Sequence, residues 1–600
     1  MNRKIILASV ATALLSTTFA SCSDDDPVVT GTDAQYVGQA TGNFTKDEWY
    51  PGGQLGTTEN TGSHCYEDEA PAVEDQGLMS QFKHGEQFFE RQFTVNTKPF
   101  KGLGPASVRT SCIDCHPGYG HGKRMPENGY KTFYGNGNGY LLVVYHPTDG
   151  LNSNDGGYVA EVTGMPQTQA TAPFKAPIDE SKIKLHWEHV TEMPSGLPLE
   201  FPDGEKFDLI YPEVSIPRDA FRTNPNPYDT GNKAVAFRLE STIGVIGTGL
   251  LDAITEDDIK AQYASTANYY KNIAKVSDVS EYVNPSFWDA NANDFVSTAW
   301  YGTFGSDGNL ADGNKPASHD FYNASTKEVE NGPAMLKRFT YALTRATLQD
   351  GPGANAIWNI TNVTRPDRPK LYTTNAWAKA MAEDEEVIQK IMADPTSPFW
   401  ASTEAETKEK VENLLKPGTN QFDNQWSGTS IKPEMSADDF YDFMVWHRGL
   451  AIPRARNLND KTVQRGKEVF MEIGCANCHR AKWVTGSDNY WTPSMIAGRK
   501  LPRYANQTIY PYTDMMQHKL YMENDIHGSW CRTTPLWGRG LSYQNTGAED
   551  RLHDCRARNE VEAIMWHAYD KRSHAYSAAL KFYNLKKADR DAVVKFLRSI

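Results

Sequence analysis

The chain has 600 residues, enough for several domains, and 39% of them are hydrophobic, enough to bury a core. With 23% charged and 11% aromatic residues, the composition excludes a disordered or fibrous chain. The 61 basic and 75 acidic residues give a formal net charge of −14. This charge argues against a nucleic-acid partner, because nucleic acids attract clustered Lys and Arg.

The N-terminus has the features of an export signal. Two basic residues precede an apolar stretch, residues 5–19, that is too short to span a bilayer. The junction before Cys22 resembles a bacterial lipobox, whose cysteine receives a diacylglycerol; ordinary cleavage after Ala20 is the alternative. We therefore predict a lipoprotein signal peptide over residues 1–21, lipidation at Cys22, and an outer membrane lipoprotein at the periplasmic or cell-surface face. The lipid would be the contact with the membrane.

An irregular arm and a first haem motif follow the signal. Residues 22–78 are rich in Gly, Thr, Asp and Glu and predict a lipidated tether and irregular arm. A helix is predicted over residues 82–93. The Cys-x-x-Cys-His motif at Cys112, Cys115 and His116 then predicts a covalently bound haem c. Two thiols at this spacing can add to the vinyl groups of one porphyrin, and the adjacent histidine can bind the iron.

The middle of the chain is predicted to be loop-rich. A hairpin is expected around residues 140–145, with extended segments up to residue 216, and helices are expected over residues 376–393 and 403–415. We assign residues 79–455 to an N-terminal haem c domain that carries a large insertion, about 261–455, and residues 456–600 to a C-terminal cytochrome c domain. The predicted fold class is mainly α: two cytochrome c-like domains with long loop-rich insertions and a few β-strands.

The second haem motif lies in that last domain. Cys475 and Cys478 are the predicted attachment sites, and His479 is the predicted axial ligand. The preceding segment, 463–470, has a helical pattern with Gly466 where a crossing helix could approach, and residues 588–600 predict the terminal helix.

Two other interpretations of the four cysteines are less favoured. A thioredoxin-like dithiol needs a βαβ context that neither pair clearly has. One shared zinc would require the pairs to meet across 359 intervening residues. Two covalently bound c haems are therefore the predicted cofactors.

Five further segments carry a family resemblance. They are Gly102–Pro105, Ile246–Ile254, Leu450–Pro453, Arg532–Gly538 and Leu552–Arg558. With the two haem motifs, they make the chain resemble the di-haem oxidoreductases, a family of peroxidases also called thiol oxidoreductases, which are related to bacterial di-haem cytochrome c peroxidases.

The resemblance implies an activity. Electrons from a small donor, which could be a cytochrome, a cupredoxin or a quinol-linked protein, would enter at the C-terminal haem and pass to the N-terminal haem, where hydrogen peroxide is reduced. One alternative is a non-catalytic electron-transfer cytochrome or a haem-bearing accessory of an outer-membrane uptake system. Another is oxidation of a protein side chain or of ferrous iron. Calcium is left open as a further cofactor.

The resemblance also implies site residues. His567 lies twelve residues after Cys555, where the family has the distal ligand of the C-terminal haem. Met565 is its nearest competitor, and Met515, Met516 and Met522 are more distant ones. For the N-terminal haem, His121 and His146 are the candidates on the distal side. Asp252 matches the region that carries the acid–base residue of related peroxidases, but a helix cap is the favoured role.

Cysteines and aromatic residues complete the expected set. Cys555 replaces the usual glycine of a His-Asp-Gly turn, and the resemblance implies a disulfide between Cys531 and Cys555, because export favours oxidation. Cys65 would be left over as a free thiol, or would be the true partner of one of the two. Trp537 and Trp566 are the candidates for a ring between the haems. The remaining residues expected to serve the second haem, with Arg pairing its propionates, are His553, Asp554, Arg556 and Arg558.

Overall fold

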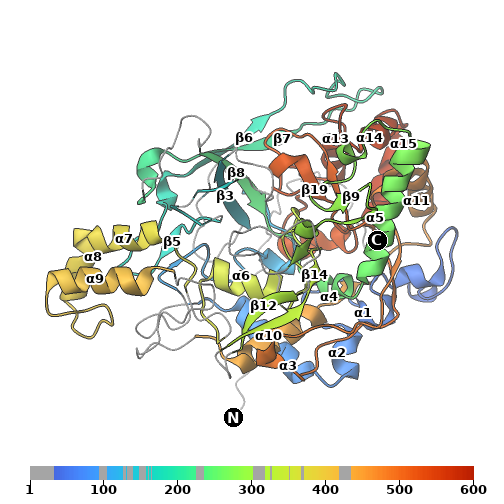
Figure 1. Ribbon diagram of the computed structural model, residues 1–600. Coiled ribbons are helices and arrows are strands. Elements are labelled where there is room, and N and C mark those ends of the chain that lie inside the picture. Colours follow the sequence, from blue (N-terminus) through green and yellow to red (C-terminus); the bar gives the residue numbers. More distant parts are fainter. Residues whose placement is uncertain are drawn as a thin grey trace, which may run out of the picture.

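The computed structural model describes residues 33–93, 104–125, 130, 139–146, 157–159, 161–163, 165–223, 235–301, 318–323, 328–349, 352–366, 371–417 and 434–600. Of the described residues, 36% are helical and 14% lie in strands, most of them in two-stranded sheets. The fold is therefore mixed (Figure 1), and the expectation of a mainly helical chain is confirmed only in part. The predicted signal peptide and Cys22 lie outside the described residues.

Two helices cross beside the first haem motif. Helix α3 (Met79–Glu90) packs against α10 (Ala437–Gly449), about 350 residues further along the chain. Gly85 makes the crossing tight, because a Cβ there would lie 2.1 Å from the Asp442 carbonyl oxygen. One turn later, the rings of Phe89 and Trp446 stack with centroids 4.3 Å apart. The predicted helix over residues 82–93 is confirmed up to residue 90, whereas α10 has no counterpart in the sequence-based prediction.

A second crossing repeats this arrangement beside the second motif. Helix α11 (Lys461–Ile473) packs against α15 (Lys587–Leu597). A Cβ on Gly466 would lie 1.9 Å from the Ala592 carbonyl oxygen, and Phe470 meets Phe596 with ring centroids 5.3 Å apart. Both predicted helices and the close approach at Gly466 are confirmed.

Four of the six described strands with six or more residues lie between residues 140 and 241. Strand β3 (Tyr140–His146) pairs antiparallel with β8 (Ala236–Ser241), with Leu142 opposite Leu239, and at its end with β4 (Gly157–Tyr158). The hairpin expected around residues 140–145 is confirmed only in part, because these residues form the single strand β3, whose main partner lies about 95 residues away. Strands β6 (Lys184–His189) and β7 (Ile210–Ser215) form a separate antiparallel pair.

Three helices form a lobe that projects at the left of Figure 1. These are α7 (Asn375–Glu383), α8 (Glu385–Met392) and α9 (Glu404–Leu415), and they share a core of their own. The helix predicted over residues 376–393 breaks at Asp384, whose carboxylate accepts a hydrogen bond from the backbone N–H of Val387 and so caps α8.

The other elements are short. The remaining α-helices are α1 (Gly53–Gly56), α2 (Pro71–Asp75), α4 (Thr248–Asp252), α5 (Glu256–Asn268), α6 (Pro352–Ile360), α12 (Ser542–Thr546), α13 (Glu560–Trp566) and α14 (Tyr576–Tyr583). The remaining strands are β1 (Thr57–Thr58), β2 (Ala106–Ser107), β5 (Gln169–Ala170), β9 (Trp288–Asp289), β10 (Asp294–Phe295), β11 (Trp300–Tyr301), β12 (Ser318–Asn323), β13 (Glu328–Pro333), β14 (Met335–Leu336), β15 (Ile452–Pro453), β16 (Trp483–Val484), β17 (Thr508–Ile509), β18 (Gln517–Lys519) and β19 (Trp530–Arg532).

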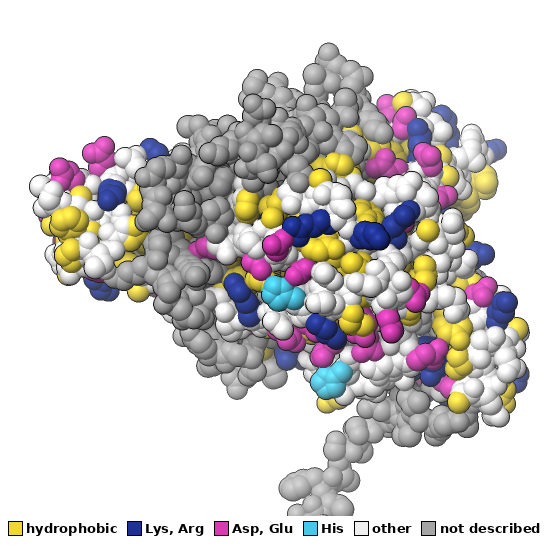
Figure 2. All heavy atoms as spheres, turned by 90° about the horizontal axis from the view of Figure 1, so that it is seen from below, with side chains coloured by type: hydrophobic (Ala, Val, Ile, Leu, Met, Phe, Trp, Pro, Cys, Tyr) yellow, Lys and Arg dark blue, Asp and Glu magenta, His cyan; other side chains and the backbone are white. Residues whose placement is uncertain are grey.

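The surface carries charges of both signs. Figure 2 shows acidic and basic side chains interspersed on the face seen from below. On α3, Lys83 pairs with Glu69 at 3.2 Å, and at the start of α10, Asp438 pairs with Arg499. Among the described helices, none is both long and apolar enough to cross a bilayer.

Candidate haem sites

Both Cys-x-x-Cys-His motifs form the same tight turn. The backbone N–H of His116 donates to the carbonyl of Cys112 at 3.0 Å, and that of His479 donates to the carbonyl of Cys475 at 3.0 Å. The turn places the histidine beside the helix that precedes each motif. The ring centroid of His116 lies 5.9 Å from that of Phe89, and the centroid of His479 lies 6.3 Å from that of Phe470.

Each motif histidine is held in the same tautomer by a backbone carbonyl. Nδ1 of His116 donates to the carbonyl of Ile243 at 2.9 Å, and Nδ1 of His479 donates to that of Tyr512 at 3.0 Å. Burial lowers the pKa of both imidazoles to about 4, so both are neutral at physiological pH. A neutral imidazole with Nδ1 engaged keeps its Nε2 lone pair for a metal, which is the arrangement that metal-ligating histidines use.

His567 lies close to the second motif. It follows the last residue of α13, and its Nδ1 donates to the Ala563 carbonyl at 2.7 Å, which again leaves Nε2 for a metal. Burial lowers the pKa of His479, and a charge on His567 would lower it further, so the two imidazoles are near each other. The competitor Met565 is fully buried in the core formed by α11, α13 and α15. The other methionine candidates, Met515, Met516 and Met522, are also buried in cores.

A cavity opens beside the first motif. It encloses about 40 Å³, and Ile243, which orients His116, lines it. Its other lining residues include Tyr66, His121, Phe339, Arg532, Trp537 and Arg539. Apolar walls with a few convergent polar groups are typical of a cofactor site.

The two histidines considered for the distal side of the first haem have different positions. His121 lines the cavity, but its two ring nitrogens lie 2.8 Å from the carbonyl oxygens of Gly122 and Leu552. Both nitrogens face the backbone, but the imidazole is neutral and has a single N–H, so it can donate to only one of these oxygens. His146 lies at the end of β3 and is not among the residues that line the cavity.

His447 is a buried histidine that the sequence analysis did not identify. It lies on α10 and is 6% exposed, and its Nδ1 has no hydrogen-bond partner. Burial, together with a charge on His116, lowers its pKa to about 3, so it lies near the first motif. The sequence feature that could have identified His447 is its position three residues before the Leu450–Pro453 segment.

The arginines that line the cavity differ from those expected at the propionates. Arg556 makes a bidentate pair with Asp554, and Arg558 pairs with Glu562. Arg532 and Arg539 line the cavity instead, and within the described residues neither forms an ion pair with a carboxylate. Burial lowers the pKa of Arg532 to about 10 and also lowers that of Arg539. Two buried cations without a carboxylate are suited to the propionates of a haem.

Asp252 is neither a helix cap nor a cavity residue. Helix α4 is preceded by Gly247, helix α5 is capped by Thr255, and Asp252 itself pairs with the buried Arg448. Arg448 also makes two hydrogen bonds, 2.9 and 2.8 Å long, to the carboxylate of Asp488. The favoured role as a cap is therefore wrong, because the carboxylate of Asp252 forms an ion pair with the guanidinium of Arg448 on α10.

The expected disulfide is not formed. Cys531 and Cys555 are both free, and so is Cys65. The Cys555 sulfur lies 3.8 Å from Nδ1 of His121, whereas the Cys531 sulfur faces the carbonyl of Arg532. The two sulfurs therefore have different neighbours and do not form the bond that the sequence led us to expect.

The two candidate bridging tryptophans lie in different surroundings. Trp537 lines the cavity beside the first motif, and its ring also lies near Gly247 at the start of α4. Trp566 is fully buried beside Met565, and the Arg556 guanidinium lies 4.6 Å from its ring centroid.

One cluster of metal-ligand type lies at the second motif. Ligand atoms of Cys478, Asp514 and His518 lie within 4.8 Å of one another. A haem thioether would use the Cys478 sulfur, which removes the thiolate that such a site needs.

The residues present therefore fit covalently bound haem at both motifs. The fit rests on the paired thiols, on the two histidines with free Nε2 atoms, and on the apolar cavity whose buried arginines lack carboxylate partners.

Comparison with known families agrees with this geometry. Residues 420–600 match the model described as "Di-haem oxidoreductase, putative peroxidase". This segment is therefore similar to the corresponding part of the di-haem oxidoreductase family. The resemblance is thus confirmed over these residues. No curated protein is similar enough to the chain to be a match.

The matched segment of the di-haem oxidoreductase family includes more than the second haem motif. It contains α10, which crosses α3 beside the first motif, and also Arg532, Arg539 and His567. The first motif itself lies before the match begins.

Proposed function

We propose that the chain is an exported di-haem c-type oxidoreductase that reduces hydrogen peroxide. Electrons from a small donor protein would enter at the haem of Cys475, Cys478 and His479 and pass to the haem of Cys112, Cys115 and His116. A haem bound at each site would supply the redox-active iron. The proposal includes export by residues 1–21 and membrane attachment through a lipid on Cys22.

One observation carries the proposal, namely the difference between the two motif histidines. The second has a neighbouring imidazole, His567, with a free Nε2, which supports six-coordinate iron suited to electron transfer. The first adjoins a cavity lined by His121, whose two ring nitrogens face backbone carbonyls, and the imidazole near it, that of His447, has no hydrogen bond that fixes its Nδ1 as the Ala563 carbonyl fixes that of His567. An open coordination position beside a cavity is what a peroxide-binding haem requires.

The protein's own side chains would perform the remaining tasks. Arg532 and Arg539 would pair with propionates and hold the haem in the cavity. Phe339 and Trp537, both buried, would exclude bulk water from it. Trp537 is the better placed of the two candidate rings for electron transfer, because it lines this cavity.

The test is the optical spectrum of the mature protein loaded with haem, oxidised and half-reduced, before and after addition of peroxide. A high-spin component that changes on addition of peroxide is expected. Two low-spin haems that are inert to peroxide would refute peroxide reduction and favour an electron carrier.

A further inference from the structure

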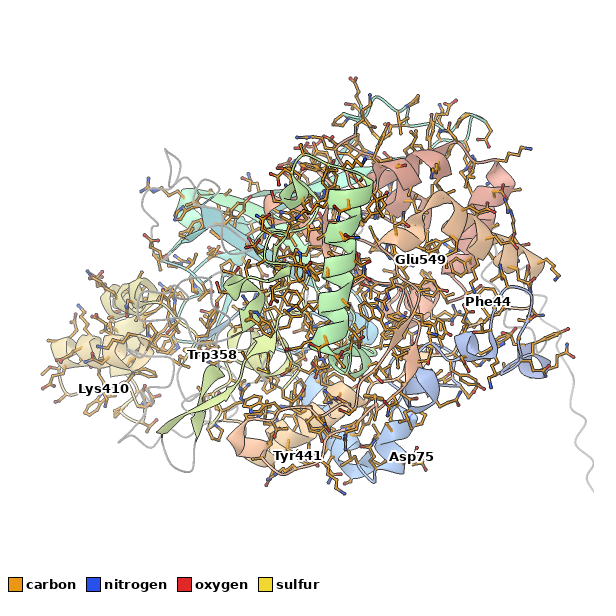
Figure 3. The ribbon with its side chains drawn as sticks, turned by 45° about the vertical axis from the view of Figure 1, so that its right-hand side comes forward. Phe44, Asp75, Trp358, Lys410, Tyr441 and Glu549 are labelled. Atoms are coloured by element: carbon orange, nitrogen blue, oxygen red, sulfur yellow. The ribbon has the colours of Figure 1, made fainter. Side chains whose placement is uncertain are left out.

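Helix α5 ends in a turn of an uncommon kind. Residues 269–273 form a π-helical turn, a rare structure that is frequent at functional sites. Figure 3 shows α5 upright in the foreground. Tyr269, in this turn, is 50% exposed, and Ile273 is 66% exposed, whereas Tyr270 is partly buried against the core beside α4 and α10. The turn therefore presents one tyrosine to solvent and the next to the interior.

A continuous series of aromatic rings begins at Tyr269. Its ring centroid lies 5.3 Å from that of Tyr270, and the ring of Tyr270 stacks on Tyr282 at 4.4 Å with an interplanar angle of 20°. Tyr282 in turn stacks on His574 at 5.3 Å. These separations are those of rings in van der Waals contact.

The series reaches the second haem motif at two points. His574 meets His518 with centroids 5.9 Å apart, and a ring nitrogen of His518 lies within 4.8 Å of the Cys478 sulfur. Tyr270 is coupled electrostatically to the same sulfur, since burial and then a charge on Cys478 raise the pKa of its phenol. The aromatic series thus connects a haem-attachment atom with the solvent.

Phenols are the side chains in this series that can lose one electron and one proton reversibly. Contact between successive rings lets an electron cross in short steps, whereas a single transfer over the whole path would be slow. Packing alone would not require the ring at the end of the series to be half exposed.

We propose that Tyr269, Tyr270 and Tyr282 carry oxidising equivalents from the second haem to the surface, where Tyr269 oxidises a one-electron donor too large to enter the cavity. The proposal rests on the proposed function, because hydrogen peroxide is the oxidant. Reduction of one peroxide to two waters takes two electrons and two protons. Both electrons come from Tyr269 through the series, one in each of two successive oxidations, and each phenolic proton goes to solvent, which supplies the two protons that the peroxide takes up. An electron from the donor and a proton then restore the phenol.

The experiment adds hydrogen peroxide to the full-length protein loaded with haem, in the presence of a nitroso spin trap. Radicals are detected by electron paramagnetic resonance, and adducts are located by peptide mass spectrometry. The variants are Tyr269→Phe and Tyr270→Phe, which keep the ring packing. The matched control is Tyr543→Phe, because Tyr543 is 57% exposed and its ring is in no aromatic pair within the described part of the chain.

The proposal predicts an adduct at Tyr269 in the wild type and in the control. Tyr270→Phe should abolish that adduct although Tyr269 is still present. If peroxide changes the haem spectrum but the adduct forms at Tyr543, or persists at Tyr269 in Tyr270→Phe, the proposal is overturned while the proposed function stands. If peroxide leaves both haem spectra unchanged, the proposed function fails and this inference fails with it.

Discussion

The two glycines at the helix crossings should be intolerant of a single methyl group. In Gly466→Ala, the new Cβ would lie 1.9 Å from the Ala592 carbonyl oxygen and 2.7 Å from Cβ of Phe596. Ordinary contact begins at 3.4 Å, so α11 and α15 would have to separate by roughly 1.5 Å in a close-packed interior. Gly85→Ala poses the same problem for α3 and α10, because its Cβ would lie 2.1 Å from the Asp442 carbonyl.

The expected cost follows from two opposing effects. Overpacking of a core costs about 1–3 kcal/mol or more, and alanine regains about 1 kcal/mol of helix propensity over glycine. Because the clash is with backbone, the overpacking cost should be near the upper end of its range, and we expect each variant to lose about 2 kcal/mol of unfolding free energy. Since the two crossings adjoin different motifs, Gly466→Ala should broaden the spectrum of the second haem, and Gly85→Ala that of the first.

The assay is chemical unfolding of the haem-loaded protein, together with the ratio of haem to protein. The control is Glu472→Ala on α11, whose side chain is 62% exposed. That control should change the unfolding free energy by no more than about 0.5 kcal/mol. If Gly466→Ala is as stable as the control, the crossing is looser than the structure shows and the argument is refuted.

Three further predictions concern the candidate sites and their surroundings. His567→Ala should convert the second haem from low to high spin, whereas His567→Met should keep it low spin with a raised potential; an unchanged optical spectrum would remove His567 from the ligand set. Asp252→Asn should lower stability, because Arg448 loses a charged partner, but should leave peroxide turnover nearly unchanged; lost turnover at unchanged stability would restore a catalytic role. Burial raises the pKa of Asp550 from 3.8 to about 6, so its contribution to stability is present below pH 4 and is lost as the pH rises through 6. Asp550→Asn should therefore melt above the wild type at pH 7.5 and together with it near pH 4; equal melting temperatures at both values would contradict the assignment.

The sequence was sufficient wherever the signal was local. Two thiols and a histidine within five residues predict haem attachment, and the periodicity of residues 463–470 and 588–600 predicts two helices that the structure contains. The family resemblance was confirmed over residues 420–600.

The sequence was insufficient to predict which side chains contact each other when they lie far apart along the chain. Asp252 lies 196 residues from Arg448, and nothing near either residue predicts their ion pair. Nearby partners were also missed, because Arg556 and Arg558, which were assigned to propionates, pair with carboxylates within four residues. The disulfide expected between Cys531 and Cys555 is not formed.

By itself, the sequence determined which residues can attach and ligate haem, because this chemistry depends on spacings of a few residues along one backbone. Only the tertiary structure showed that α10 crosses α3 beside the first motif, that Arg532 and Arg539 line the cavity, and that the rings from Tyr269 to His574 form one series. These contacts join segments far apart in the chain. They are selected by the packing of the whole core, in which the volume and charge of every neighbour decide which of several partners a side chain meets.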